Sequence, residues 1–223
     1  MLKAVLFDLD GTLLPMDEEK FTKGYFGMLC QKLAPFGYNS EDLVSAIWTG
    51  TKEMIKNDGS RTNEQAFWDC FVKIYGEEKL KDKHLFTDFY QNEFKAVKKF
   101  CSENKDARGV IDFVKAQGLK VILASNPLFP RDGMITRLSF IDLTEDDFNY
   151  ITSYEISHFT KPNPKFYQEI LENNHLGADE VIFFGNSETE DGEPARKIGI
   201  KTFLLGKDIE FSDIKNIIAN EKQ

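Results

Sequence analysis

Residues 3–12 read KAVLFDLDGT, and this stretch decides the fold. A short run of β-branched and aromatic residues, 3–7, ends at two acids and an Asp-Gly pair, which is a turn signal. The stretch therefore predicts a buried strand that leads directly into a loop. Asp8 and Asp10 fall at the carboxyl end of this strand.

Three further apolar runs resemble the first, at 119–124 (LKVILA), 181–184 (VIFF) and 200–205 (IKTFLL). Each run is continuous and does not alternate with polar residues, which is typical of strands in a sheet that is covered on both faces. These segments predict the strands of a buried sheet.

Helical patterns lie between the predicted strands. One covers 107–117 and ends at Gly118, and another covers 164–174 and begins with a proline after the capping residue Asn163. Because strands and helices alternate, the sequence predicts a parallel α/β sheet.

Residues 17 to about 95 interrupt this alternation, because they contain no convincing strand. Their apolar residues recur at helical spacing, which most simply indicates the core of a helix bundle. The predicted helices are 17–34, 41–56, 63–75 and 85–99. We expect an all-helical module inserted just after the first strand, with linkers near 14–17 and 96–104.

The composition excludes several classes of function. A net charge of −9 argues against a protein that grips nucleic acid, which needs a surplus of lysine and arginine. The three cysteines are few and widely spaced, which suits reduced thiols and a cytoplasmic location. No run of 18 apolar residues and no signal-peptide pattern is present, so we expect no membrane partner.

Polar residues collect where the predicted strands end. In an open parallel sheet ligands bind at these carboxyl ends, so the residues there are candidates for one site. Each has a simpler explanation when taken alone, such as turn formation, helix capping or a solvated lysine. Together they supply what is needed to bind a phosphate with Mg²⁺, which prefers hard oxygen ligands. They are Asp8, Asp10, Ser125, Asn126, Lys161, Asn186, Glu190 and Asp191.

Four motifs follow one another along the chain: FDLDGTL, a Ser-Asn at a strand end, a Lys-Pro, and a strand that ends in Gly before several acids. Together they resemble the motifs of the haloacid dehalogenase superfamily of phosphotransferases. The resemblance covers essentially the whole chain. It implies a Rossmann-like three-layer core with a parallel sheet, and an all-helical C1 cap inserted after the first strand. The expected core domain is 1–16 and 96–223, and the expected cap domain is 17–95.

The resemblance also implies a role for each motif residue. Asp8 would be the nucleophile that forms an aspartyl-phosphate, and Asp10 would protonate the leaving oxygen and then deprotonate water. Lys161 would neutralise charge on Asp8 and the phosphate. Phosphate binding would fall to Ser125, Asn126, Lys161 and Thr12, with Thr12 also setting the loop, and Mg²⁺ binding to Asp8, Asp10, Asn186, Glu190 and Asp191.

Asn186 departs from the family pattern, in which an aspartate that contacts the metal follows the glycine. One interpretation is decay of the metal site, which would leave a phosphate sensor. The other is an exchange of amide and acid across four residues, because Glu190-Asp191 follows where the family usually has Asn-Asp. We favour exchange, since the other motif residues are all present.

The sequence thus predicts Mg²⁺-dependent hydrolysis of a small phosphorylated metabolite. An acid at the position of Asp10 fits reactions in which an alkoxide leaves. The resemblance implies that dehalogenases of this family usually lack this acid, so Asp10 argues against dehalogenation. Two alternatives stay open: a phosphomutase of the same fold, and a non-catalytic phosphate-binding or scaffold protein. In the helical module, Trp48, Lys52 and Arg61 are more simply core or surface residues than substrate contacts.

Overall fold

The computed structural model describes residues 1–222, and its centre is a five-stranded parallel sheet in the order β3-β2-β1-β4-β5. The strands are β1 (Ala4–Phe7), β2 (Lys120–Leu123), β3 (Tyr150–Ile151), β4 (Val181–Gly185) and β5 (Lys201–Leu204). Because β1 lies between β2 and β4, its carboxyl end sits where the strand order reverses, the usual place for a ligand site in such sheets. Gln223, the last residue of the expected core domain, lies outside the described residues.

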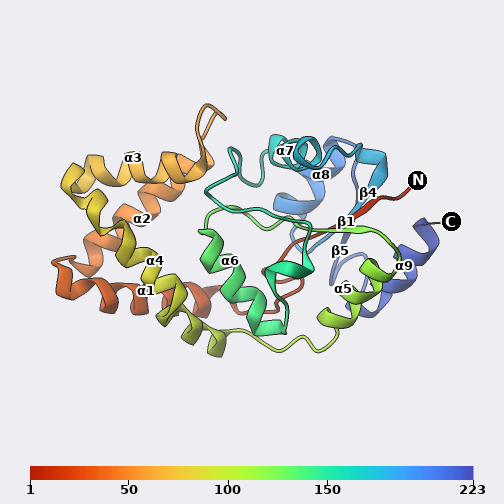
Figure 1. The fold of residues 1–223 in the computed structure, drawn as a ribbon, viewed down its shortest axis with the longest axis horizontal. Coiled ribbons are helices and arrows are strands. Elements are labelled where there is room, and N and C mark those ends of the chain that lie inside the picture. The colour runs from red at the N-terminus through yellow and green to blue at the C-terminus, as the bar shows by residue number, and fades with distance from the viewer. Residues whose placement is uncertain (223) are drawn as a thin grey trace.

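Alternate side chains of β1 pack on opposite faces of the sheet. Val5 and Phe7 belong to an apolar cluster with α5 (Ala107–Ala116) and α9 (Ile214–Glu221). Ala4 and Leu6 belong to a second cluster with α7 (Pro164–Asn174) and, through Ala195, α8 (Glu193–Lys197). Figure 1 shows the two helix pairs on opposite sides of the strands. The three-layer α/β architecture predicted from the continuous apolar runs is therefore confirmed.

The segment between β1 and α5 is helical and lies to one side of the sheet (Figure 1). Its α-helices are α1 (Glu18–Leu33), α2 (Ser40–Ile55), α3 (Asn63–Tyr75) and α4 (Lys83–Gln91). The first three begin where Asp17, Asn39 and Thr62 accept hydrogen bonds from the first turn, as capping residues do. The division of the chain into a core domain and a cap domain stays a prediction.

Two helical segments differ from the predictions. The predicted helix 85–99 is two elements, because the backbone leaves the helical region at Asn92 (φ −118°, ψ −80°) and continues as a 3-10 helix, Glu93–Phe100. The helix α6 (Arg131–Leu138) was not predicted. Shorter 3-10 helices cover Ala34–Phe36, Glu77–Asp82, Ser139–Ile141, Glu145–Asp147, Ala178–Glu180 and Phe211–Asp213, and a π-helical turn covers Glu188–Gly192.

The chain enters and leaves the helical segment at one place. Met16 and Cys101 form an antiparallel bridge, and the Ser102 N–H donates to the Pro15 carbonyl at 2.7 Å. The N-terminus of α3 is attached to the sheet domain's loops as well, since the N–H groups of Asn63 and Glu64 donate to carbonyls of Ser157 and Tyr154, both at 2.8 Å. Within residues 1–222, no helix is long and apolar enough to cross a membrane.

Candidate active site

A cavity of about 390 Å³ lies at the carboxyl ends of β1, β2 and β4, and we call it the catalytic cavity. The side chains that line it come from segments far apart in the sequence, as expected for residues at the ends of neighbouring parallel strands. It includes every predicted site residue except Thr12: Asp8, Asp10, Ser125, Asn126, Lys161, Asn186, Glu190 and Asp191.

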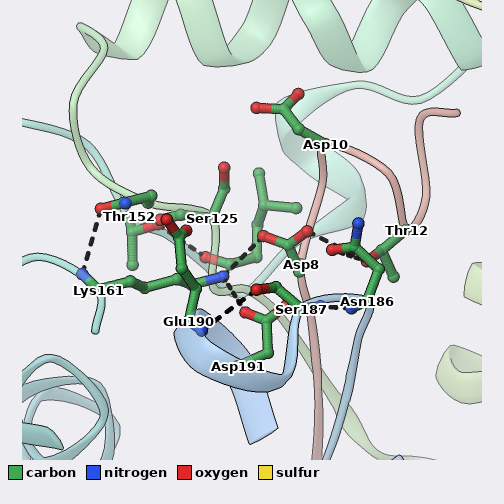
Figure 2. Close-up of polar contacts among 12 residues, drawn as sticks. Asp8, Asp10, Thr12, Ser125, Thr152, Lys161, Asn186, Ser187, Glu190 and Asp191 are labelled. Atoms are coloured by element: carbon green, nitrogen blue, oxygen red, sulfur yellow. Dashed lines mark hydrogen bonds and ion pairs between the residues drawn. The ribbon is translucent and has the colours of Figure 1, made fainter. Parts of the chain in front are cut away.

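Lys161 lies between two carboxylates in this cavity (Figure 2). Its Nζ is 2.7 Å from Asp8 Oδ1 and 2.6 Å from Asp191 Oδ1. All three side chains are almost fully buried, at 8% exposure or less, so water screens their charges little. The structure thus brings together Asp8, the predicted nucleophile, and the lysine that the sequence placed in one site with it.

The charges in this trio shift the pKa of two groups. Burial raises the pKa of the Asp8 carboxyl to about 7; Lys161 opposes that shift, whereas Asp191 and Asp10 add to it. Burial alone would lower the pKa of Lys161, but Asp8, Tyr167 and Asp191 outweigh it and hold the pKa well above its ordinary value. Lys161 is therefore a fixed positive charge in a site with an excess of acids.

Asp191 was predicted as a metal ligand, and this stays a prediction. In the structure its Oδ1 accepts from Lys161 and from the Tyr167 hydroxyl at 3.3 Å, and its Oδ2 accepts the N–H groups of Asn186 and Ser187, both at 3.0 Å. Through these four bonds Asp191 holds Lys161 and the loop after β4 in place.

The backbone at Gly185 passes close to the Asp191 side chain, and this makes the arrangement possible. A Cβ atom at position 185 would lie 2.5 Å from Asp191 Oδ2, so only glycine leaves room for the carboxylate beneath the strand end. The π-helical turn Glu188–Gly192, whose first turn is capped by the Ser187 hydroxyl, brings Asp191 back toward that strand end.

Thr12 was predicted to bind phosphate and to set the loop, and the phosphate contact stays a prediction. Its side chain is buried and is not among the residues that line the catalytic cavity. The Thr12 hydroxyl donates toward Asp8 Oδ2 at 3.1 Å and Asn186 Oδ1 at 3.4 Å, contacts that suit its role in setting the loop.

The Ser125-Asn126 segment lies on the other side of Asp8 (Figure 2). Thr152, which follows β3, donates its hydroxyl hydrogen to the Ser125 carbonyl at 2.6 Å and so fixes this turn. The Asn126 Oδ1 accepts the Lys161 N–H at 3.2 Å. These contacts leave the Ser125 hydroxyl facing the cavity, as a phosphate-binding group requires.

Asp10 points away from Asp8 and toward α6 (Figure 2). Its Oδ2 forms an ion pair with Arg137, whose side chain is fully buried and stacks 4.4 Å from the centre of the Phe129 ring. The other oxygen, Asp10 Oδ1, is buried and has no hydrogen-bond partner among the described residues. Arg137 was missed at the sequence level, because its partner lies 127 residues earlier and α6 itself was not predicted.

The oxygens around Thr12 suit a small, hard cation. Asp8 Oδ2 and Asn186 Oδ1 both lie within hydrogen-bond reach of the Thr12 hydroxyl, and the site carries excess negative charge. Mg²⁺ keeps several waters and needs few protein oxygens, so this donor set fits it. Among the described residues there is no group of three or more His, Cys, Asp or Glu side chains placed to hold a metal ion.

Glu190 was also predicted as a metal ligand, and this stays a prediction. Figure 2 shows its side chain on the Ser125 side of Asp8, opposite Thr12 and Asn186. Burial raises the pKa of the Glu190 carboxyl, and the charge of Lys161 partly opposes that shift.

Comparisons with known proteins agree with the fold. The family model described as haloacid dehalogenase-like hydrolase matches residues 5–205. A Thermotoga maritima protein named phosphorylated carbohydrates phosphatase is 28% identical over 206 residues, which cover 90% of this chain and 83% of that protein.

Two solved structures share the fold at low sequence identity. One is a HAD phosphatase from Thermococcus onnurineus, 18% identical, with a TM-score of 0.59 and full coverage of both chains. The other is a HAD-family enzyme from Bacteroides thetaiotaomicron in complex with magnesium and inorganic phosphate, 18% identical, with a TM-score of 0.55. It covers 96% of this chain and 99% of its own.

Proposed function

This chain belongs to the haloacid dehalogenase-like hydrolases, and from that premise we propose that it is a Mg²⁺-dependent phosphatase that hydrolyses phosphate monoesters of small metabolites. The name of the Thermotoga relative supports a phosphorylated substrate. The observation that carries the proposal is the contact of Asp8 with Lys161, and of Lys161 with Asp191, in a cavity shared with Ser125 and Asn126.

The proposed reaction has two steps on this chain's own residues. An Asp8 oxygen attacks phosphorus, the ester P–O bond breaks, and Asp10 gives its proton to the departing alkoxide, so that the alcohol leaves. A water molecule then attacks the aspartyl-phosphate and gives a proton to Asp10, and phosphate leaves. Asp10 is restored to its starting state.

The surrounding residues would lower the barrier by charge and position. Lys161 offsets the repulsion between the Asp8 carboxylate and the anionic phosphoryl group, which is strong in a buried site. Ser125 and Asn126 would orient the transferring oxygens. Asp8 and Asn186 would hold Mg²⁺, which would supply further positive charge to offset the charge of the phosphoryl group.

Phosphate release from p-nitrophenyl phosphate with Mg²⁺ tests the proposal. We expect turnover by the wild type, loss on addition of a chelator, and a drop of at least ~10³-fold in kcat for Asp8→Asn. Beryllium fluoride with Mg²⁺ should raise the melting temperature of the wild type but not of Asp8→Asn. An unchanged kcat in Asp8→Asn, or no turnover and no stabilisation of the wild type, would reject the mechanism.

A further inference from the structure

A second cavity, of about 230 Å³, lies among the helices of the segment between β1 and α5. We call it the aromatic cavity, because ten of its fifteen lining residues are aromatic and none is charged. Its walls come from α1 to α4 and from the segment around Phe129. Small protein cavities of about 150 Å³ with apolar walls bind benzene, so this one is about half as large again as a single ring needs.

The aromatic cavity adjoins the catalytic cavity. Five residues line both cavities: Phe21, Thr22, Trp48, Leu128 and Phe129. A molecule with its phosphate beside Asp8 and Lys161 would therefore extend past Trp48 and Phe129 into the aromatic cavity. The part of a phosphate monoester that extends away from phosphorus is its alcohol.

Most polar side chains at the aromatic cavity already have hydrogen-bond partners. The hydroxyls of Tyr25 and Tyr90 are 2.8 Å apart, and the Trp68 indole N–H donates to the Tyr154 hydroxyl at 3.5 Å. The Thr51 hydroxyl donates to the Ile47 carbonyl at 2.9 Å. A sugar placed here would lose water from several hydroxyls and find few free partners, at a cost of roughly tenfold in binding for each.

Apolar groups, in contrast, gain from the same environment. Burial of each methylene group favours binding by about fourfold, and ring stacking adds to this in a cavity with aromatic walls. We propose that the aromatic cavity binds the alcohol part of the substrate, and that the substrate is the phosphate monoester of an apolar alcohol with an aryl or medium-length hydrocarbon group. This inference rests on the proposed function.

A matched set of substrates tests it. 3-Phenylpropyl phosphate, glucose 6-phosphate and ethyl phosphate are all esters of primary alcohols, so their leaving groups differ little in intrinsic reactivity. We expect kcat/KM for the phenylpropyl ester to exceed that for glucose 6-phosphate by at least ~100-fold, and to exceed that for ethyl phosphate. Equal or faster hydrolysis of glucose 6-phosphate would overturn the inference and leave the proposed function intact. No phosphate release from any ester, including p-nitrophenyl phosphate, would reject both.

Binding can be measured without catalysis, because both tryptophans of the chain, Trp48 and Trp68, line the aromatic cavity. Titration of the full chain with 3-phenylpropan-1-ol should change tryptophan fluorescence to saturation, and glucose at the same concentrations should not. The alcohol should also inhibit hydrolysis of its phosphate ester. The absence of a saturable change would overturn the inference even if the enzyme is an active phosphatase.

Two substitutions on α2 form a matched pair. Thr51 lines the aromatic cavity and Thr49 is exposed, while both hydroxyls donate to the carbonyl four residues earlier. Thr51→Phe should fill the aromatic cavity and lower kcat/KM for the phenylpropyl ester at least ~10-fold, with ethyl phosphate changed less than twofold. Thr49→Phe should change neither. Equal effects of the two variants would contradict the inference, and if Thr51→Phe does not fold, the wild-type titration decides.

Discussion

At the scale of single residues, the ion pair with Arg137 sets the orientation of the Asp10 side chain, the proposed general acid and base. A buried charge that loses its partner destabilises a protein by about 3–5 kcal/mol, and the Asp10 side chain is 30% exposed, so we expect the lower end for Arg137→Met. Urea unfolding at pH 7 measures the loss. The double variant Asp10→Asn/Arg137→Met should recover part of it, because no unpaired carboxylate remains.

Arg137 also has an expected effect on catalysis, as a positioning residue for Asp10. We expect Arg137→Met to lower kcat at least ~10-fold with KM within threefold, because Asp10 would lose its fixed orientation while the phosphate-binding groups stay in place. Arg137→Lys should restore part of kcat, since it keeps the charge. A fall in stability with an unchanged kcat would show that Arg137 serves the fold only.

Asn186 sets the strength of the proposed Mg²⁺ site. Its Oδ1 lies beside the Thr12 hydroxyl, as does Asp8 Oδ2, so an aspartate there would add a charged oxygen at the same place. We expect Asn186→Asp to lower the half-saturating Mg²⁺ concentration about 10- to 100-fold. The rise in melting temperature with Mg²⁺ concentration gives the same comparison of the two proteins without turnover. Identical Mg²⁺ dependence in both assays would show that residue 186 does not contact the metal.

The sequence identified the residues with chemistry but not all of their contacts. Asp8 and the Ser125-Asn126 turn were found because they follow predicted strands, and Lys161 was found in the Lys-Pro motif between two predicted strands. The hydrogen bonds of Asp191 to Asn186 and Ser187 could not be predicted, because they depend on the π-helical turn, which sequence spacing does not reveal.

At the scale of elements, Asp147 joins α5 to the 3-10 helix that precedes β3. Burial alone would raise the pKa of its carboxyl, but hydrogen bonds from Arg108, Thr144 and Lys115 outweigh it and hold the pKa below its ordinary value of 3.8. Asp147 therefore stabilises the fold above about pH 4, and this contribution is lost as the pH falls below the unfolded-state value.

We accordingly expect Asp147→Asn to lower the free energy of unfolding at pH 7 by about 1–2 kcal/mol, allowing for solvent around the partly exposed Arg108. The difference from the wild type should shrink as the pH falls below 4, and urea unfolding at several pH values measures it. Asp112→Asn is the control, because Asp112 lies 3.6 Å from the same Arg108 but its side chain is 58% exposed. If the difference in the free energy of unfolding between Asp147→Asn and the wild type is constant with pH, the lowered pKa of Asp147 is contradicted.

The elements that sequence reasoning found and missed differ in physical character. The helices 63–75 and 164–174 were predicted with their observed bounds, because each has a capping residue at its start and a regular apolar stripe. The helix α6, RDGMITRL, has a glycine and several polar residues, and its buried positions include Thr136 and Arg137. Such a helix is held by tertiary contacts, so a search for an apolar stripe does not find it.

At the scale of the whole molecule, one apolar cluster runs from the helical segment into the sheet. It contains Phe67 and Phe71 of α3 as well as Val5 and Phe7 of β1. We therefore expect the whole chain to unfold in one cooperative transition. Both tryptophans report on the helical segment, so tryptophan fluorescence and far-UV circular dichroism should give the same denaturation midpoint. A fluorescence midpoint at lower urea would instead support an independent cap domain.

The two crossings at Met16 and Cys101 lie side by side, with Ser102 bonded to Pro15. The helical segment between them is therefore an insertion whose ends are joined at one place, and we expect changes away from its contacts with the sheet to leave the contact of Asp8 with Lys161 in place. In evolutionary terms, selection can replace the recognition surface while the chemistry is inherited unchanged. A library randomised only between these crossings would explore new substrates on a constant reaction centre.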